Sequence, residues 1–374
     1  MGDRLGERED HGALAPRICI ISMFEQEASI WLDESSFLDF CKEIKVDGLL
    51  PNFCTLHCTA DANVCQVTVG ESGIHEVNAA LSIYALLASP LFDFRHTYFL
   101  IAGVAGINPK AGTIGSVGFA RYAVQVDLRY EFDARQIPAD WATGYVPSGS
   151  SRPDEYPQII YGTEVYELND ALRQFAVERA GRASLADSQP AAEYRAWYAK
   201  NGGGRYRAAG QPPRVLSTCD VATSNVFFHG SLLSESVEKT VGLFTGGAAK
   251  YCMTNQEDNA ILAALLRGSL SGKADFSRVI VMRAGSNFDQ PYTPDTPLKM
   301  PLHSGHGGFE PSLKNLYLVG SEVIAAILEQ WSATFENGIP PENYIGDILG
   351  SLGRIPDFGQ NQRRSVEQSG AAKP

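Results

Sequence analysis

The sequence predicts one α/β domain with a central mixed, largely parallel twisted sheet flanked by helices. Apolar runs of strand length alternate along the chain with segments whose apolar residues recur at helical spacing, which is the pattern of β-α-β units. The 374 residues are 44% hydrophobic and 20% charged, which is enough to bury one large core. We find no internal repeat and no linker that would divide the chain, so we expect a single domain.

The first half of the chain is expected to open the sheet and to place helices between its strands. Arg17–Met23 is an apolar run bounded by charge and predicts a buried strand, after which Glu25–Trp31 begins a helix. Gly73–Ala88 has helical periodicity, and Thr97–Ala102 predicts a second strand that runs into a glycine-rich segment. Val117–Leu128 predicts one or two more strands. Ligands bind at the carboxyl ends of strands in such sheets, so we expect the site directly after these runs.

The second half begins with the least regular part of the chain. Residues 133–214 are rich in Pro, Gly, Ser and Asp and are expected to form an irregular insertion with one helical stretch near Glu167–Glu178. The polar ends, residues 1–16 and 355–374, are predicted to be disordered, which leaves 17–354 as the domain. The remaining predicted elements are strands at Arg214–Thr218 and Arg278–Ala284 and helices at Gln256–Arg267 and Asn315–Phe335.

The charge balance argues against two classes of partner. The chain has 31 Lys and Arg against 43 Asp and Glu, a net charge of −12, whereas non-specific nucleic-acid binding requires many cations for the phosphates. The longest apolar run, Ala79–Phe92, is interrupted by Ser and Pro, and a membrane-spanning helix needs about 20 mostly apolar residues. Met1–Arg17 is charged and lacks the apolar core of a signal peptide. We therefore expect a soluble, cytoplasmic protein without nucleic-acid or membrane partners.

The seven cysteines do not form a recognisable metal site. Cys54, His57, Cys58 and Cys65 lie close together, but no second Cys/His pair follows at the spacing of a zinc site. We expect reduced, buried thiols and no metal.

The segment Gly103–Pro109, GVAGINP, follows a predicted strand. Glycines at such a place allow backbone N–H groups to approach an anion or a ribose. The alternative is a tight turn with no ligand, and the spacing is not that of a dinucleotide-binding loop.

Five motifs in a fixed order resemble a known superfamily. They are SGIHEVNAA at 72–80, IAGVAGINPKAGTIGSV at 101–117, STCDVATSNVFF at 217–228, NQEDNAILAAL at 255–265 and VMRAGSNFD at 281–289. This order is similar to that of nucleoside phosphorylases and methylthioadenosine nucleosidases. The details GTIGSVGFARYAVQVDLRYEFDARQIP and YGTEVYELN resemble more closely the purine nucleoside permease family. The resemblance covers residues 17–340 and implies a nucleoside-phosphorylase-like fold and a homo-oligomer.

The resemblance implies cleavage of the N-glycosidic bond of a purine nucleoside. We expect phosphate as co-substrate, with a free base and a pentose 1-phosphate as products, and no cofactor. One alternative is a nucleosidase that uses water, and another is a soluble nucleoside-binding protein that assists uptake. Bond cleavage needs a carboxylate for the ribose hydroxyls, a donor for the departing base and a nucleophile.

The resemblance places these roles on particular residues. Glu257 matches the ribose-binding glutamate, although Thr254-x-x-Glu257 is also a capping box. Asn287 stands where nucleosidases carry an acid, so Asp289 is the predicted general acid, and Ser286 positions this segment. Glu27 matches the residue that polarises the attacking water, with an exposed carboxylate in the first turn of a helix as the alternative.

The phosphate site is the weakest part of the match. The arginine that some phosphorylases carry before the glycine segment is replaced here by Ile101 and Ala102. Arg121, Arg283 and Thr113 are the predicted substitutes, and structural ion pairs are the alternative for both arginines. Phe227 is predicted to stack on the base, unless it belongs to the core. The other predicted substrate contacts are Gly103, Val104, Ala105, Gly106, Asp220 and Gln256.

Overall fold

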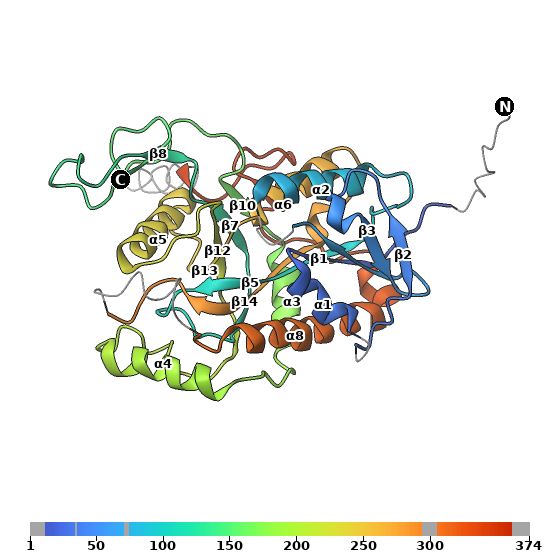
Figure 1. Ribbon diagram of the computed structural model, residues 1–374. Coiled ribbons are helices and arrows are strands. Elements are labelled where there is room, and N and C mark those ends of the chain that lie inside the picture. Colours follow the sequence, from blue (N-terminus) through green and yellow to red (C-terminus); the bar gives the residue numbers. More distant parts are fainter. Residues whose placement is uncertain (1–11, 34–35, 71–74, 294–304, 361–374) are drawn as a thin grey trace, which may run out of the picture.

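A large mixed sheet with helices on both faces forms the centre of the molecule (Figure 1). The computed structural model describes residues 12–33, 36–70, 75–293 and 305–360. Within these ranges the sheet runs in the order β15-β10-β7-β12-β13-β5-β1-β4-β3-β2, with a branch in which β14 pairs with β5, β6 with β14 and β11 with β6. The strands of the first half are β1 Ile18–Ser22, β2 Lys42–Lys45, β3 Thr55–Cys58, β4 Val64–Thr68, β5 Tyr98–Ile107, β6 Val117–Phe119, β7 Tyr122–Gln125 and β8 Arg129–Glu131. Those that follow are β9 Tyr145–Pro147, β10 Val165–Glu167, β11 Val215–Leu216, β12 Asp220–Thr223, β13 Tyr251–Asn255, β14 Val279–Phe288 and β15 Gly346–Asp347.

The centre of the sheet contains two groups of parallel strands that run in opposite directions. In one group β4, β1, β5 and β14 run parallel, and in the other β7, β12 and β13 do. The groups join where Ile107 of β5 pairs antiparallel with Met253 of β13. Ile107 is the last residue of β5 and Met253 the central residue of the five-residue β13, so the carboxyl ends of both groups converge on one place. Ligands bind at such ends, and the fold therefore creates one natural site there.

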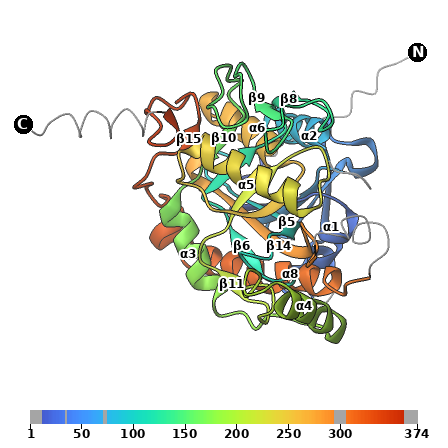
Figure 2. The same ribbon diagram turned by 90° about the vertical axis from the view of Figure 1, so that its left-hand side faces the viewer.

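Helices cover both faces of the sheet. α2 (Glu76–Ala88) and α6 (Asp258–Leu270) lie side by side on one face, and α1 (Glu25–Leu32), α3 (Asp170–Ala180) and α8 (Phe309–Glu329) cover the other (Figures 1 and 2). α8 continues into a π-helical turn at Trp331–Phe335. α4 (Gln189–Asn201) and α5 (Ser231–Thr245) flank the end of the sheet where the strand ends converge.

Successive side chains of the central strands point to opposite faces of the sheet, and helices bury both sets. Ile18 and Ile20 of β1 pack with the α8 side, whereas Cys19 and Ile21 pack with the α2 and α6 side. All four are fully buried, so β1 appears in the sequence as a continuous apolar run. The predicted fold class, an α/β domain with a largely parallel central sheet, is confirmed.

The region predicted as an irregular insertion is more regular than its composition indicates. Residues 133–214 contain α3 and a second helix, α4, and their strand β10 pairs with β7 and β15 in the main sheet. The sequence did not signal α4, because its apolar residues do not gather on one face.

Parts of both predicted disordered ends pack against the domain. Leu14 pairs with Phe92 in a parallel bridge, and Phe358 is buried edge-on against the rings of Tyr122 and Tyr344. The rest of these predictions, residues 1–11 and 361–374, lies outside the described residues.

Two disulfides replace four of the predicted free thiols. Cys58–Cys65 joins β3 to β4, and Cys219–Cys252 links the start of β12 to β13. The prediction of seven reduced thiols is therefore wrong for these four, since strand register brings their side chains together and spacing in the sequence does not reveal register. Cys19, Cys41 and Cys54 are free.

Candidate active site

A small pocket opens where the two groups of strand ends converge. Its lining comes from the ends of β5, β13 and β14 and from the loop that follows β12. The lining residues are Gly106, Ser224, Val226, Phe227, Phe228, Thr254, Asn255, Gln256, Asn287 and Asp289. We call this cavity the base pocket. Five predicted site residues line it together: Gly106, Phe227, Gln256, Asn287 and Asp289.

Asp289 lines this pocket, and one of its carboxylate oxygens has no hydrogen-bond partner in the described part of the chain. The side chain is buried, and its Oδ2 accepts hydrogen bonds from the Ser234 hydroxyl (2.7 Å) and the Tyr251 phenol (2.6 Å). Oδ1 is equally buried but has no hydrogen-bond partner among the described residues. Burial raises the pKa of Asp289 to about 6, although the two hydroxyl donors oppose the shift. Asp289 is thus a carboxyl group that can carry a proton close to neutral pH.

Asn287 is held by its own strand. Its Oδ1 accepts from the Ser286 hydroxyl and its Nδ2 donates to the Phe288 carbonyl, both at 3.1 Å. One N–H of this amide remains for a ligand, since a primary amide has two. Gly106 lies opposite, and a Cβ there would come within 2.8 Å of Thr254 Oγ1 and 3.5 Å of Asn287 Nδ2. Glycine is therefore needed to keep the pocket open at this position.

A buried group of charges lies next to the pocket. Arg283 bonds to the carboxylates of Glu257 and Asp258 and to the Val104 carbonyl (3.3 Å). Glu27 accepts from the backbone N–H of Val104 (2.6 Å) and of Met23 (2.8 Å). We call Glu27, Glu257, Asp258 and Arg283 the carboxylate cluster.

The carboxylate cluster contains three acidic groups and one cation, all buried. Burial raises the pKa of Glu27 to about 8, despite the nearby Arg283, and it also raises the pKa of Glu257. Glu27 is fully buried rather than exposed in the first turn of α1, so the exposed alternative does not hold.

The glycine-rich segment is part of a strand and not a loop. Gly103 and Gly106 lie within β5, where they pair with β14. A Cβ on Gly103 would lie 2.4 Å from Arg283 Nη1 and 2.9 Å from Glu27 Oε1. The N–H groups of Val104 and Gly106 are already donated to Glu27 and to Thr254. The glycines thus make room for side chains, and these two N–H groups are not free to cradle an anion.

The capping-box alternative for Glu257 does not form. Thr254 Oγ1 accepts from Gly106, and Asn255 Oδ1 instead accepts from the N–H groups of Glu257 (3.2 Å) and Asp258 (2.9 Å) at the start of α6. The Glu257 carboxylate faces Arg283 and accepts from the backbone N–H of Gln256 (3.1 Å), whose side chain lines the base pocket. A ribose-binding role for Glu257 stays a prediction.

Three predicted residues lie away from the base pocket. Asp220 is at the opposite end of β12, where it accepts backbone N–H bonds from Arg121, Tyr122 and Lys250. The Arg121 guanidinium bonds to Glu167 (2.6 and 2.9 Å). Thr113 is buried and donates to the Ala209 carbonyl. Both predicted phosphate-binding arginines, Arg121 and Arg283, are thus paired with carboxylates, which is the alternative that the sequence left open.

A second cavity of about 410 Å³ adjoins the base pocket and shares Ser224, Val226, Phe227 and Phe228 with it. Its other lining residues are Asp127, Arg129, Glu131, Tyr145, His229, Leu233 and Val237. We call it the side pocket. Phe227 is 60% exposed between the two cavities, so it is free to contact a ligand and is not a core residue.

Sequence reasoning missed Ser234, Tyr251, Asp127, Arg129 and His229. Asp127 and Arg129 directly follow the apolar run of β7, so the rule that ligands bind after strand ends would have found them.

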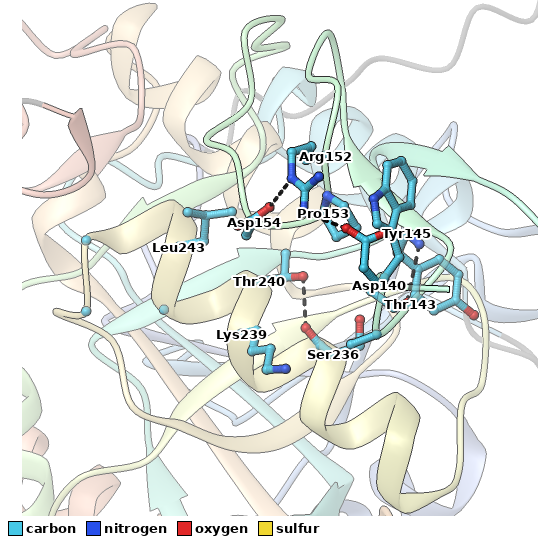
Figure 3. A pocket seen from close by; sticks show the side chains of 15 residues that line it. Asp140, Thr143, Tyr145, Arg152, Pro153, Asp154, Ser236, Lys239, Thr240 and Leu243 are labelled. Carbon is cyan, nitrogen blue, oxygen red and sulfur yellow. Dashed lines mark hydrogen bonds and ion pairs between the residues drawn. The ribbon is translucent and has the colours of Figure 1, made fainter. Parts of the chain in front are cut away.

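Another cavity, of about 610 Å³, lies between α5 and the segment 140–154 and contains none of the predicted residues (Figure 3). Arg152 and Asp154 form an ion pair at its rim. In the described part of the chain no group of His, Cys, Asp and Glu could hold a metal ion, and no helix is long and apolar enough to span a membrane.

Several solved structures share the fold at low sequence identity. A 5′-methylthioadenosine/S-adenosylhomocysteine nucleosidase from Neisseria meningitidis is 15% identical with a TM-score of 0.47, over 84% of this chain and 99% of that one. The futalosine hydrolase of Helicobacter pylori is 14% identical with a TM-score of 0.45, over 83% and 98%.

Similarity in sequence is much stronger to proteins of one family. A purine nucleoside permease of Candida albicans is 39% identical over 351 residues, covering 92% of this chain and 83% of the relative. A probable purine nucleoside permease of Schizosaccharomyces pombe is 38% identical over 325 residues, covering 85% and 90%. The family model "Purine nucleoside permease (NUP)" matches residues 15–340. The chain therefore belongs to the purine nucleoside permease family.

Proposed function

We propose that this protein binds a purine nucleoside at the base pocket and cleaves its N-glycosidic bond with water as the nucleophile. The ligand class follows from the names of the relatives. The observation that carries the chemistry is the free, buried Oδ1 of Asp289 at a pocket that Asn287 also lines.

Asp289 serves as the general acid. The C–N bond breaks with its electron pair going to the base, and the protonated Asp289 gives its proton through Oδ1 to a ring nitrogen. Ser234 and Tyr251 hold Oδ2, so that the free oxygen keeps one orientation. The remaining N–H of Asn287 donates to the base as negative charge develops there.

The carboxylate cluster binds the sugar and assists the attack of water on it. Glu257 accepts hydrogen bonds from the ribose hydroxyls, and the carboxylates of Glu257 and Asp258, joined by Glu27 when it is ionised, favour the positive charge that develops on the ribose. Glu27, when ionised, takes a proton from the attacking water while the water oxygen bonds to the anomeric carbon. The products are a free base and a free pentose.

The same charge balance favours water over phosphate. A phosphate dianion beside this site would meet an arginine already paired with Glu257 and Asp258, and a third carboxyl group, Glu27, that becomes negative as pH rises toward 8. Phosphorolysis, which the resemblance implies, would need a cation that leaves its carboxylate partners.

The test follows free base and free sugar from inosine, guanosine and adenosine, each with and without phosphate. We expect release of base and pentose without phosphate, and at least a ~30-fold loss in Asp289→Asn, because an amide cannot deliver the proton. Asp275→Asn is the matched control. Asp275 is a half-exposed carboxylate away from the pocket, and it accepts hydrogen bonds from Arg278 and Ser277.

The other outcomes separate the remaining candidates. Phosphate-dependent release of a pentose 1-phosphate would replace hydrolysis by phosphorolysis. Binding without turnover would favour a nucleoside-binding role, as the name permease of the relatives suggests. A homo-oligomer, a cytoplasmic location and independence from cofactors stay predictions.

A further inference from the structure

We propose that the side pocket reads the pyrimidine edge of a 6-oxopurine, so that the protein prefers hypoxanthine and guanine nucleosides to adenine nucleosides. This inference rests on the proposed binding of a purine nucleoside and names the base. The juxtaposition behind it is a cavity with three unpartnered polar atoms beside the pocket that holds Asn287 and Asp289.

Three residues of the side pocket each carry one buried polar atom without a hydrogen-bond partner in the described ranges. They are Oδ1 of Asp127, Nη1 of Arg129 and Nε2 of His229. Buried polar atoms are normally paired, because each lost hydrogen bond costs about 1–3 kcal/mol. Three such atoms from residues that line one cavity therefore indicate a ligand that pairs with them.

The three atoms differ in hydrogen-bonding character. The guanidinium nitrogen of Arg129 donates, and its group is held in place on the Tyr145 ring at 3.5 Å from the ring centroid. Asp127 Oδ1 accepts, while its Oδ2 is fixed by the backbone N–H of Asn225 (2.8 Å). Burial lowers the pKa of His229 to about 4, so the ring is neutral at neutral pH. The other ring nitrogen of His229 donates a hydrogen bond to the Phe288 carbonyl, which leaves Nε2 as an acceptor.

One donor and two acceptors match the edge of a 6-oxopurine. Arg129 would donate to O6, Asp127 would accept from N1–H, and His229 would accept from the 2-amino group of guanine. Adenine has an amino group at position 6 and an unprotonated N1, so it would place a donor against Arg129 and an acceptor against Asp127. Sites that pair a substrate group reject an analogue that cannot pair, because their own buried atoms are left without partners.

The two cavities are contiguous, and with about 410 Å³ in the side pocket against about 20 Å³ in the base pocket, most of a bound purine would lie in the side pocket. They share Phe227 and Phe228, whose rings offer stacking surfaces on the wall between them. The imidazole side of the base would face Asn287 and Asp289, and the pyrimidine side would face the side pocket. A phosphate is the less favourable occupant, since the carboxylates of Asp127 and Glu131 line the same cavity as Arg129.

The test measures binding of free hypoxanthine and free adenine to the full chain by calorimetry, so that it does not depend on turnover. We expect hypoxanthine to bind at least ~10-fold more tightly than adenine. Asp127→Asn keeps an oxygen for the Asn225 N–H but can turn an amide donor toward N1, so the ratio should fall to about one or reverse. His229→Phe should remove any advantage of guanosine over inosine. Asp154→Asn, which removes one exposed carboxylate outside the side pocket, should leave the ratio unchanged.

The outcomes distinguish this inference from the proposed function. Purine binding with equal affinity for both bases, an unchanged ratio in Asp127→Asn, or competition by millimolar phosphate overturns the inference and leaves nucleoside binding intact. A clear preference for hypoxanthine without any release of base supports the inference while the proposed cleavage fails. No binding of any purine overturns both.

Discussion

Replacement of Arg283 by methionine should destabilise the protein in a pH-dependent way. Arg283 is buried and bonds to Glu257, Asp258 and the Val104 carbonyl, and Glu27 lies beside it. Methionine has a similar length but no charge, so the variant leaves three buried carboxylates without their cation. Loss of one partner of a buried ion pair costs about 3–5 kcal/mol. At roughly 2 °C per kcal/mol for a chain of this size, Tm should fall by about 6–10 °C at neutral pH.

The dependence on pH follows from the carboxyl groups. Burial already raises the folded-state pKa of Glu27 to about 8, and loss of the cation that opposes this shift raises it further. A carboxyl whose pKa is higher in the folded than in the unfolded state favours folding below its unfolded pKa, and this contribution is lost as pH rises through the folded pKa. The Tm difference between wild type and Arg283→Met should therefore be small near pH 4.5 and should grow toward pH 8.

Thermal unfolding followed by circular dichroism between pH 4.5 and 8.5 measures this difference. Arg121→Met is the matched control, because the Arg121 guanidinium is one-third exposed and loses mainly its pair with Glu167. Its Tm loss should be smaller than that of Arg283→Met. An Arg283→Met variant of unchanged stability, in a protein that phosphate stabilises only when Arg283 is present, would refute the reasoning and identify Arg283 as a phosphate ligand.

Three further predictions test other parts of the structure. The profile of kcat/KM against pH should be bell-shaped with limbs near 6 and 8, and Asp289→Asn should remove the fall of activity at alkaline pH, because Asp289 acts when protonated and Glu27 when ionised, as kinetics with guanosine would reveal. Gly103→Ala should destabilise by about 1–3 kcal/mol, since its Cβ would meet Arg283 and Glu27, whereas Gly242→Ala in α5 has open space; urea titrations compare the two. Thiol titration of the denatured chain should find three thiols before reduction and seven after it, and seven before reduction would rule out both disulfides.

The sequence predicts the fold better than the site. The fold follows from local patterns of apolar residues, whereas the site depends on contacts between residues that are far apart in the chain. The runs that form β1, β5 and β14 are apolar on both faces, and a continuous apolar run between charged residues is a local signal. The ion pairs of Arg283 are not local: its partners Glu257 and Asp258 lie 26 and 25 residues away. The sequence alone could not decide whether this arginine serves a ligand or a carboxylate.

The same limit applies to the disulfides and to the glycines of β5. Cys219 and Cys252 are brought together by the pairing of β12 with β13, which no spacing rule predicts. Gly103 is glycine because Arg283 and Glu27 occupy the space of a side chain there, and not because the backbone turns. A glycine-rich segment after a strand has both meanings in sequence, and only the packing around it distinguishes them.

The proposed cleavage assigns the acid to Asp289, directly after the last residue of β14, and not to the position two residues before it. The superfamily that the sequence resembles has its acid at the position of Asn287, where this chain has an amide that cannot give a proton. Asp289 lies in the bend just beyond the end of β14, only two residues after Asn287. Both residues do line the base pocket, and the hydroxyls of Ser234 and Tyr251 hold the carboxyl at its new place. Under the proposed function the departure from the pattern at 287 is a relocated acid rather than a lost one, and the remaining N–H of Asn287 would bind the base that Asp289 protonates.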